Sequence, residues 1–83
     1  MYMVKQNTTS VQSPWLAEEN GKVTFSPIME LLGRGVLPKV FARPGEAHRY
    51  VSMRLNGGSQ DARLYRADET PDGIKFVLEP WPL

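Results

Sequence analysis

The chain has 83 residues, a net charge of +1 and no cysteine. A chain of this length has room for one hydrophobic core, and without cysteine neither disulfide bonds nor a thiolate metal site can supplement that core. Hydrophobic residues make up 41% of the sequence and charged residues 23%, a balance that is typical of globular proteins and excludes an intrinsically disordered chain. We therefore expect one folded domain that spans residues 1–83.

The N-terminal residues and the hydropathy pattern predict the compartment. Residues 1–10 carry one lysine and a run of polar side chains where a secretory signal would need an apolar run. No stretch approaches the ~20 apolar residues of a membrane span. The sequence thus predicts a cytoplasmic protein that does not enter a membrane.

Two short strands are predicted near the N-terminus. Residues 2–5 form the first, and residues 6–14 follow as a polar loop that we expect to be mobile. An asparagine and a glycine at 20–21 signal a turn, and polar and apolar residues then alternate over 22–25 as in a half-buried strand.

A short helix is predicted at 27–32. Ser26 is suited to the N-cap, Pro27 to the first helical position and Gly33 to the residue just past the end. The apolar residues of this helix would form its buried face: Ile28, Leu31 and Leu32.

The rest of the chain predicts strands joined by tight turns, because turn residues separate segments in which polar and apolar side chains alternate. We expect four consecutive antiparallel strands, at 36–43, 47–55, 61–67 and 74–78. Their inward-facing residues would include Val51, Met53 and Leu55 in the second strand and Ile74, Phe76 and Leu78 in the last. A proline-rich, extended tail follows at 79–83.

The predicted fold is therefore mainly β, of the α+β class. It is an antiparallel β-meander or a small open barrel of four to six strands, with one short helix at about 27–32. If Phe76 belongs to the core of this fold, its truncation to alanine should cost about 3–5 kcal/mol of stability.

The sequence offers little material for catalysis. His48 is the only histidine, and without cysteine it cannot form a zinc site of ordinary ligand composition. On one strand, His48 and Ser52 would lie about 13 Å apart, too far for a nucleophile and a base to share a hydrogen bond. The glycines at 33–35 and 56–58 lack the strand, helix and lysine of a phosphate-binding loop. We expect a nonenzymatic protein without catalytic residues, metal or cofactor.

Charge is distributed unevenly along the chain. Residues 34–66 contain seven basic and two acidic residues, whereas residues 67–83 contain four acidic residues and one basic residue. Arginines interleaved with tyrosines on an open sheet face suit single-stranded nucleic acid, because guanidinium groups hold phosphates while aromatic rings stack on bases. The alternative is a solvated sheet face on which the arginines pair with Glu46 and Asp61.

The predicted binding residues all lie in the second half of the chain. Trp81 has two interpretations: its indole seals the end of the core, or it anchors a partner. The predicted ligand is single-stranded DNA or RNA, and the alternative is an acidic protein bound by a small adaptor or inhibitor. The candidate binding residues are Arg43, His48, Tyr50, Arg54, Arg63, Tyr65 and Trp81.

Residues 49–56 (RYVSMRLN), 62–65 (ARLY) and 73–76 (GIKF) form a pattern that covers about half of the chain. This pattern resembles the C-terminal half of small uncharacterised proteins carried by conjugative plasmids and other mobile elements. The first half of the chain, including the predicted helix, has no counterpart in that pattern. The resemblance implies a small accessory protein of mobile DNA, with no known activity to carry over.

Overall fold

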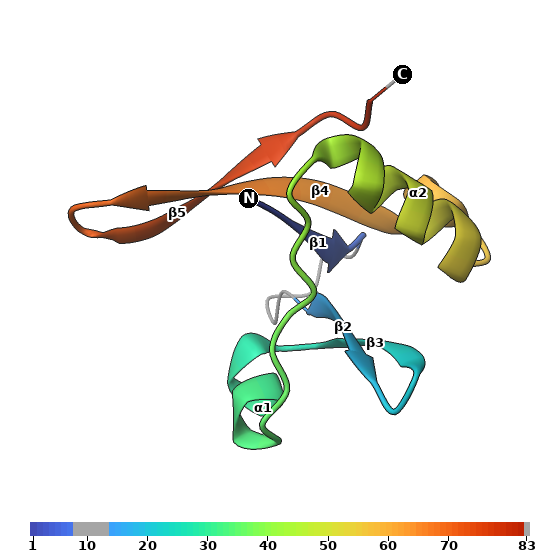
Figure 1. The fold of residues 1–83 in the computed structure, drawn as a ribbon, viewed down its shortest axis with the longest axis horizontal. Coiled ribbons are helices and arrows are strands. Elements are labelled where there is room, and N and C mark those ends of the chain that lie inside the picture. The colour runs from blue at the N-terminus through green and yellow to red at the C-terminus, as the bar shows by residue number, and fades with distance from the viewer. Residues whose placement is uncertain (8–13, 83) are drawn as a thin grey trace.

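The computed structural model describes residues 1–7 and 14–82 (Figure 1). Within these residues, five strands form one antiparallel sheet in the order β3-β2-β1-β4-β5. The strands are β1 (Tyr2–Gln6), β2 (Trp15–Glu19), β3 (Lys22–Ser26), β4 (Ala62–Thr70) and β5 (Gly73–Glu79). The helices are α1 (Ile28–Gly33), α2 (Pro44–Arg54) and the short 3-10 helix η1 (Gly58–Asp61). The predicted fold class, a mainly β protein of the α+β class with four to six antiparallel strands, is confirmed.

β1 lies at the centre of the sheet, between β2 and β4. Its pairing with β4 runs from Tyr2 opposite Arg66 to Gln6 opposite Ala62, whereas β1 and β2 meet at Lys5 and Trp15. Because β4 follows β1 only after two further strands and both α-helices, the connection is long-range, and the sheet is not a simple meander.

The predicted strands at 2–5, 22–25, 61–67 and 74–78 are confirmed in β1, β3, β4 and β5, with shifts at their ends. β2 was not predicted. The predicted loop at 6–14 falls largely outside the described residues, since these exclude 8–13. In the predicted tail, Glu79 still belongs to β5, and residues 80–82 follow it without regular structure.

The predicted strand at 47–55 is wrong, because these residues belong to α2. Pro44 lies in the first turn of α2, where the backbone N–H that proline lacks has no partner in the helix. Ala47 and Val51, one helical turn apart, are fully buried. Met53, which the strand pattern placed inside with Val51, is 78% exposed.

The predicted strand at 36–43 is also absent. This segment meets the sheet at two points: Phe41 exchanges two backbone hydrogen bonds of 2.8 Å with Tyr2, and the N–H of Lys39 donates to the carbonyl of Leu16 at 2.8 Å. Pro38 has no N–H to add to a ladder, which helps to explain why no continuous strand forms there.

The two α-helices cover opposite faces of the sheet, and successive residues of each strand alternate between these faces. On the α2 face, helix residues Ala47 and Val51 pack with buried strand residues, including Val4, Leu16 and Leu64. On the α1 face, Leu31 packs with Met3, Trp15 and Ala17. The two hydrophobic clusters hold α1 and α2 against different parts of one sheet (Figure 1).

Only one of the three residues expected on the buried face of α1 is fully buried. Leu31 has no exposed surface, whereas Ile28 is 36% and Leu32 is 50% exposed. α1 has six residues, so it has under two turns with which to contact the sheet. The shortness of the helix leaves the other two side chains partly in solvent.

The inward orientation predicted for the apolar residues of β5 is wrong. Ile74 is 61%, Phe76 38% and Leu78 56% exposed. β5 is an edge strand, and the hairpin that it forms with β4 projects beyond the other strands (Figure 1). Leu78 pairs with Tyr65 and therefore lies on the same face of the sheet as α1. However, α1 packs against β1 and β2 and does not reach the β4–β5 hairpin at the edge of the sheet.

Candidate functional site

The structure distributes the predicted binding residues over two faces of the sheet. Arg43 is the N-cap residue of α2, and His48, Tyr50 and Arg54 belong to that helix. Arg63 and Tyr65 lie on β4, opposite Lys5 and Met3 of β1, and therefore on the α1 face. The sequence-predicted residues thus do not form one continuous surface.

Tyr50 and Arg54 converge on Glu18 of β2. The Tyr50 hydroxyl donates a hydrogen bond of 2.6 Å to Glu18 Oε1, and Arg54 Nη1 lies 3.4 Å from the same oxygen. Arg54 Nη2 also donates to the carbonyl oxygen of Gly21 at 3.0 Å. These contacts attach α2 to the turn region between β2 and β3.

The same contacts shift two pKa values in opposite directions. Burial, followed by the hydrogen bond to Glu18 and the negative charge of Glu18, raises the pKa of Tyr50 to about 12. The hydrogen bond from Tyr50 lowers the pKa of Glu18, and the charges of Lys39 and Arg54 lower it further. Glu18 is therefore held as an anion and Tyr50 as a neutral donor.

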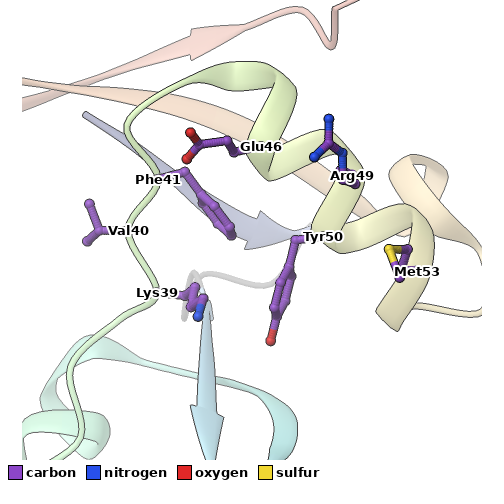
Figure 2. Close-up of a pocket in the computed structure, with 7 residues that line it drawn as sticks. All are labelled: Lys39, Val40, Phe41, Glu46, Arg49, Tyr50 and Met53. Atoms are coloured by element: carbon purple, nitrogen blue, oxygen red, sulfur yellow. The ribbon is translucent and has the colours of Figure 1, made fainter.

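A groove of about 410 Å³ opens between α2 and the extended segment before it (Figure 2). We call it the α2 groove. The rings of Phe41 and Tyr50 lie at its centre, with centroids 5.5 Å apart. Lys39 Nζ lies 5.2 Å from the centroid of the Tyr50 ring. The groove is lined by Lys39, Val40, Phe41, Glu46, Arg49, Tyr50 and Met53.

Two apolar side chains of the α2 groove are unusually open to solvent. Val40, on the extended segment, is 45% exposed, and Met53, on the helix, is 78% exposed. Lys39 adds a cation on the extended segment, Arg49 adds a cation on the helix, and Glu46 adds one acid on the helix (Figure 2). The groove therefore offers apolar contact and positive charge together.

Sequence reasoning missed most of the α2 groove because it took 47–55 for a strand. Once α2 is recognised, Glu46, Arg49, Tyr50 and Met53 follow the spacing i, i+3, i+4 and i+7 of one helical face. The signal for that helix was Pro44 at its first position, with Ala47 and Val51 four residues apart.

A second cluster lies on the α1 face, at the junction of β1, β2, β4 and β5. Lys5 Nζ is 4.7 Å from the ring centroid of Trp15 and 4.8 Å from that of Tyr65. Phe76 lies against Trp15, with centroids 4.8 Å apart. Burial lowers the pKa of Lys5. Next to Lys5 in the register, Arg63 donates a hydrogen bond of 2.9 Å from Nε to Asn7 Oδ1.

Trp81 is half-buried at the end of the α2 face. Its Nε1 donates a hydrogen bond of 3.1 Å to the carbonyl oxygen of Ala62, and its ring packs against the hydrophobic cluster on the α2 face. The His48 ring lies 5.7 Å away, between centroids. This position agrees with the interpretation that Trp81 seals the core, and it brings His48 and Trp81 together.

Across residues 1–7 and 14–82, no three His, Asp or Glu side chains gather where they could hold a metal ion. No helix in this part of the chain is long and apolar enough to cross a membrane.

Comparisons with protein-family models, curated proteins and solved structures found no match for this chain. The resemblance to proteins of mobile elements thus stays a prediction.

Proposed function

We propose that the protein is a nonenzymatic binding module and that the α2 groove binds an acidic, partly apolar segment of another protein. The supporting observation is the exposure of Val40 and Met53, which line the groove together with Lys39 and Arg49. Methionine adapts its shape to varied apolar partners, and exposed apolar groups rimmed by charges are typical of interaction sites. The two cations would attract and orient acidic residues of the partner.

The burial of the aromatic rings favours a peptide over a nucleic acid in this groove. Stacking on bases requires an accessible ring face. Phe41 is only 6% exposed, and Tyr50 is held by Glu18 with Lys39 and Arg54 beside its ring. The accessible groups in the groove are therefore aliphatic or charged: Val40 and Met53, the two cations and Glu46.

The experiment is capture of partners from host lysate on immobilised protein, with and without nuclease. We expect a protein partner that nuclease does not remove and that Met53→Glu and Arg49→Glu each release. Met29→Glu is the matched control, because Met29 on α1 is 77% exposed and lies outside the groove. Arrays of short peptides should then show binding to acidic sequences with apolar residues. Equal capture by wild type and Met53→Glu contradicts this use of the groove.

A second candidate is single-stranded nucleic acid, bound on the α1 face. It is favoured by one observation: Lys5 and Arg63 lie next to Tyr65 and near the partly exposed Phe76 on the same face of the sheet. Cations beside aromatic rings on an open sheet suit phosphates and bases. Loss of all captured partners on nuclease treatment favours this candidate over the first.

A further inference from the structure

β5 is an edge strand with little protection. Its seven residues pair with β4 on one side, and no strand of residues 1–7 or 14–82 pairs with its other side. The backbone groups along such an edge are a template for a further strand. Proteins usually protect edges with lysine, proline, bulges or a covering segment. In β5, Lys75 is the only lysine, and Pro80 comes after the strand has ended.

The side chains of β5 also favour association. Ile74, Phe76 and Leu78 are exposed and lie on the same face, because residues two apart in a strand point the same way. The opposite face carries Lys75, Val77 and Glu79. A strand with a continuous apolar row and opposite charges near its two ends is suited to pair with an antiparallel copy of itself.

We propose that two copies of this chain pair through β5, antiparallel, about a two-fold axis at Val77. This inference goes beyond the proposed function, since it uses none of the residues of the α2 groove. In this register Lys75 lies opposite Glu79 of the second copy, and Phe76 lies opposite Leu78 of the second copy. Each of these pairs occurs twice, as two-fold symmetry requires.

The charges next to β5 favour this register. Arg66 of β4 forms ion pairs with both Asp68, at 3.0 Å, and Glu79, so one guanidinium serves two carboxylates. The chain's own Lys75 lies opposite Asp68, and Lys75 of the second copy would bring a further cation to Glu79. A register centred on Phe76 would instead place Lys75 opposite Val77 and diagonal to the other Lys75, where like charges repel.

Variants that reverse the charge of Lys75 or of Glu79 test the proposed pairing of two β5 strands. Analytical ultracentrifugation of the wild-type chain should show a micromolar monomer–dimer equilibrium. Lys75→Glu and Glu79→Lys should each weaken self-association by at least about 10-fold, since each places like charges opposite one another twice. An equimolar mixture of the two variants should restore dimers, because only the mixed dimer regains both Lys–Glu pairs. Lys22→Glu, on the other edge strand β3, should leave association unchanged.

Cysteine cross-linking gives an independent measurement, since Glu79→Lys also removes an ion pair to Arg66 and could unfold the hairpin. The chain has no cysteine, so a single introduced thiol reports on its own position. Val77→Cys lies on the proposed axis and should oxidise readily to a disulfide-linked dimer. Lys75→Cys should not, because the two thiols would lie about 13 Å apart along the strands. Wild type that stays monomeric at ~1 mM, or equal cross-linking of both variants, overturns the proposal.

Discussion

The hydroxyl of Tyr50 donates a 2.6 Å hydrogen bond to the carboxylate of Glu18, and this contact joins the main helix to the sheet. Arg54 reinforces it, since its guanidinium approaches both Glu18 and the carbonyl of Gly21. One wall of the α2 groove is therefore fixed to a rigid sheet. The other wall is the extended segment that hydrogen-bonds to the sheet through Lys39 and Phe41.

Removing the Tyr50 hydroxyl should destabilise the protein modestly. Tyr50→Phe deletes one hydrogen bond to a charged but partly exposed acceptor, so we expect the free energy of unfolding to fall by about 0.5–1.5 kcal/mol. Urea denaturation followed by circular dichroism measures this change. Tyr65→Phe is the matched control, because the Tyr65 hydroxyl makes no hydrogen bond to any described residue. An equal loss in both variants would contradict a role for the Glu18 contact.

Stability should also decrease at alkaline pH through Tyr50. The folded-state pKa is raised from 10.0 to about 12, so between these values the folded chain binds more protons than the unfolded chain. The stabilisation is complete below pH ~10 and is lost as the pH rises towards 12. The free energy of unfolding should therefore fall more steeply between pH 10 and 12 in wild type than in Tyr50→Phe. Parallel slopes in the two proteins would contradict the raised pKa.

The structure revises the expected effect of truncating Phe76. This ring is 38% exposed and lies against Trp15, so Phe76→Ala should cost about 1 kcal/mol, below the 3–5 kcal/mol expected for a core aromatic. Leu64→Ala, at a fully buried position of the same hairpin, should cost about 2–5 kcal/mol. Thermal or urea unfolding of the two variants provides the comparison. A larger loss for Phe76→Ala than for Leu64→Ala would place Phe76 in the core after all.

The parts of the fold that the sequence predicted depend on local chemistry. The turns before β3 and β5 have glycines at positive φ, Gly21 at 78° and Gly73 at 123°, and both turns were visible as sequence signals. β2 was missed because Trp15, Leu16 and Ala17 are all buried, so the strand has no alternation to detect. The pairing of β1 with β4 joins distant segments and leaves no local pattern.

The site shows the same division between local and long-range information. Tyr50 and Arg54 were predicted on one face of a strand, and they do lie together, although on a helix. Residues four apart lie on the same face of a helix and also of a strand, so Tyr50 and Arg54 were correctly expected to lie together although the element was assigned wrongly. Arg63 and Tyr65 share a face because β4 was assigned correctly. That the two pairs lie on opposite faces of the sheet depends on tertiary packing, which the sequence pattern does not encode.

The last prediction separates the two candidate ligands through salt dependence. If the α1 face binds single-stranded nucleic acid, the affinity for a labelled oligonucleotide should fall with salt, with a log–log slope of about −0.7 per phosphate contacted. Arg63→Ala should reduce that slope by about one contact. Tyr65→Ala should weaken binding by about 1–3 kcal/mol with little change in slope, since stacking releases few counterions.

Arg54→Ala and Tyr50→Ala provide the controls for this measurement, because these residues belong to α2, on the other face of the sheet. Both should bind the oligonucleotide like wild type in fluorescence anisotropy, provided that circular dichroism shows them folded. If they lower the affinity while Arg63→Ala and Tyr65→Ala do not, nucleic acid binds at α2, through only two of the residues predicted from the sequence. If wild type shows no binding even at low salt, the nucleic-acid candidate is rejected, and the acidic peptide in the α2 groove stays as the proposed ligand.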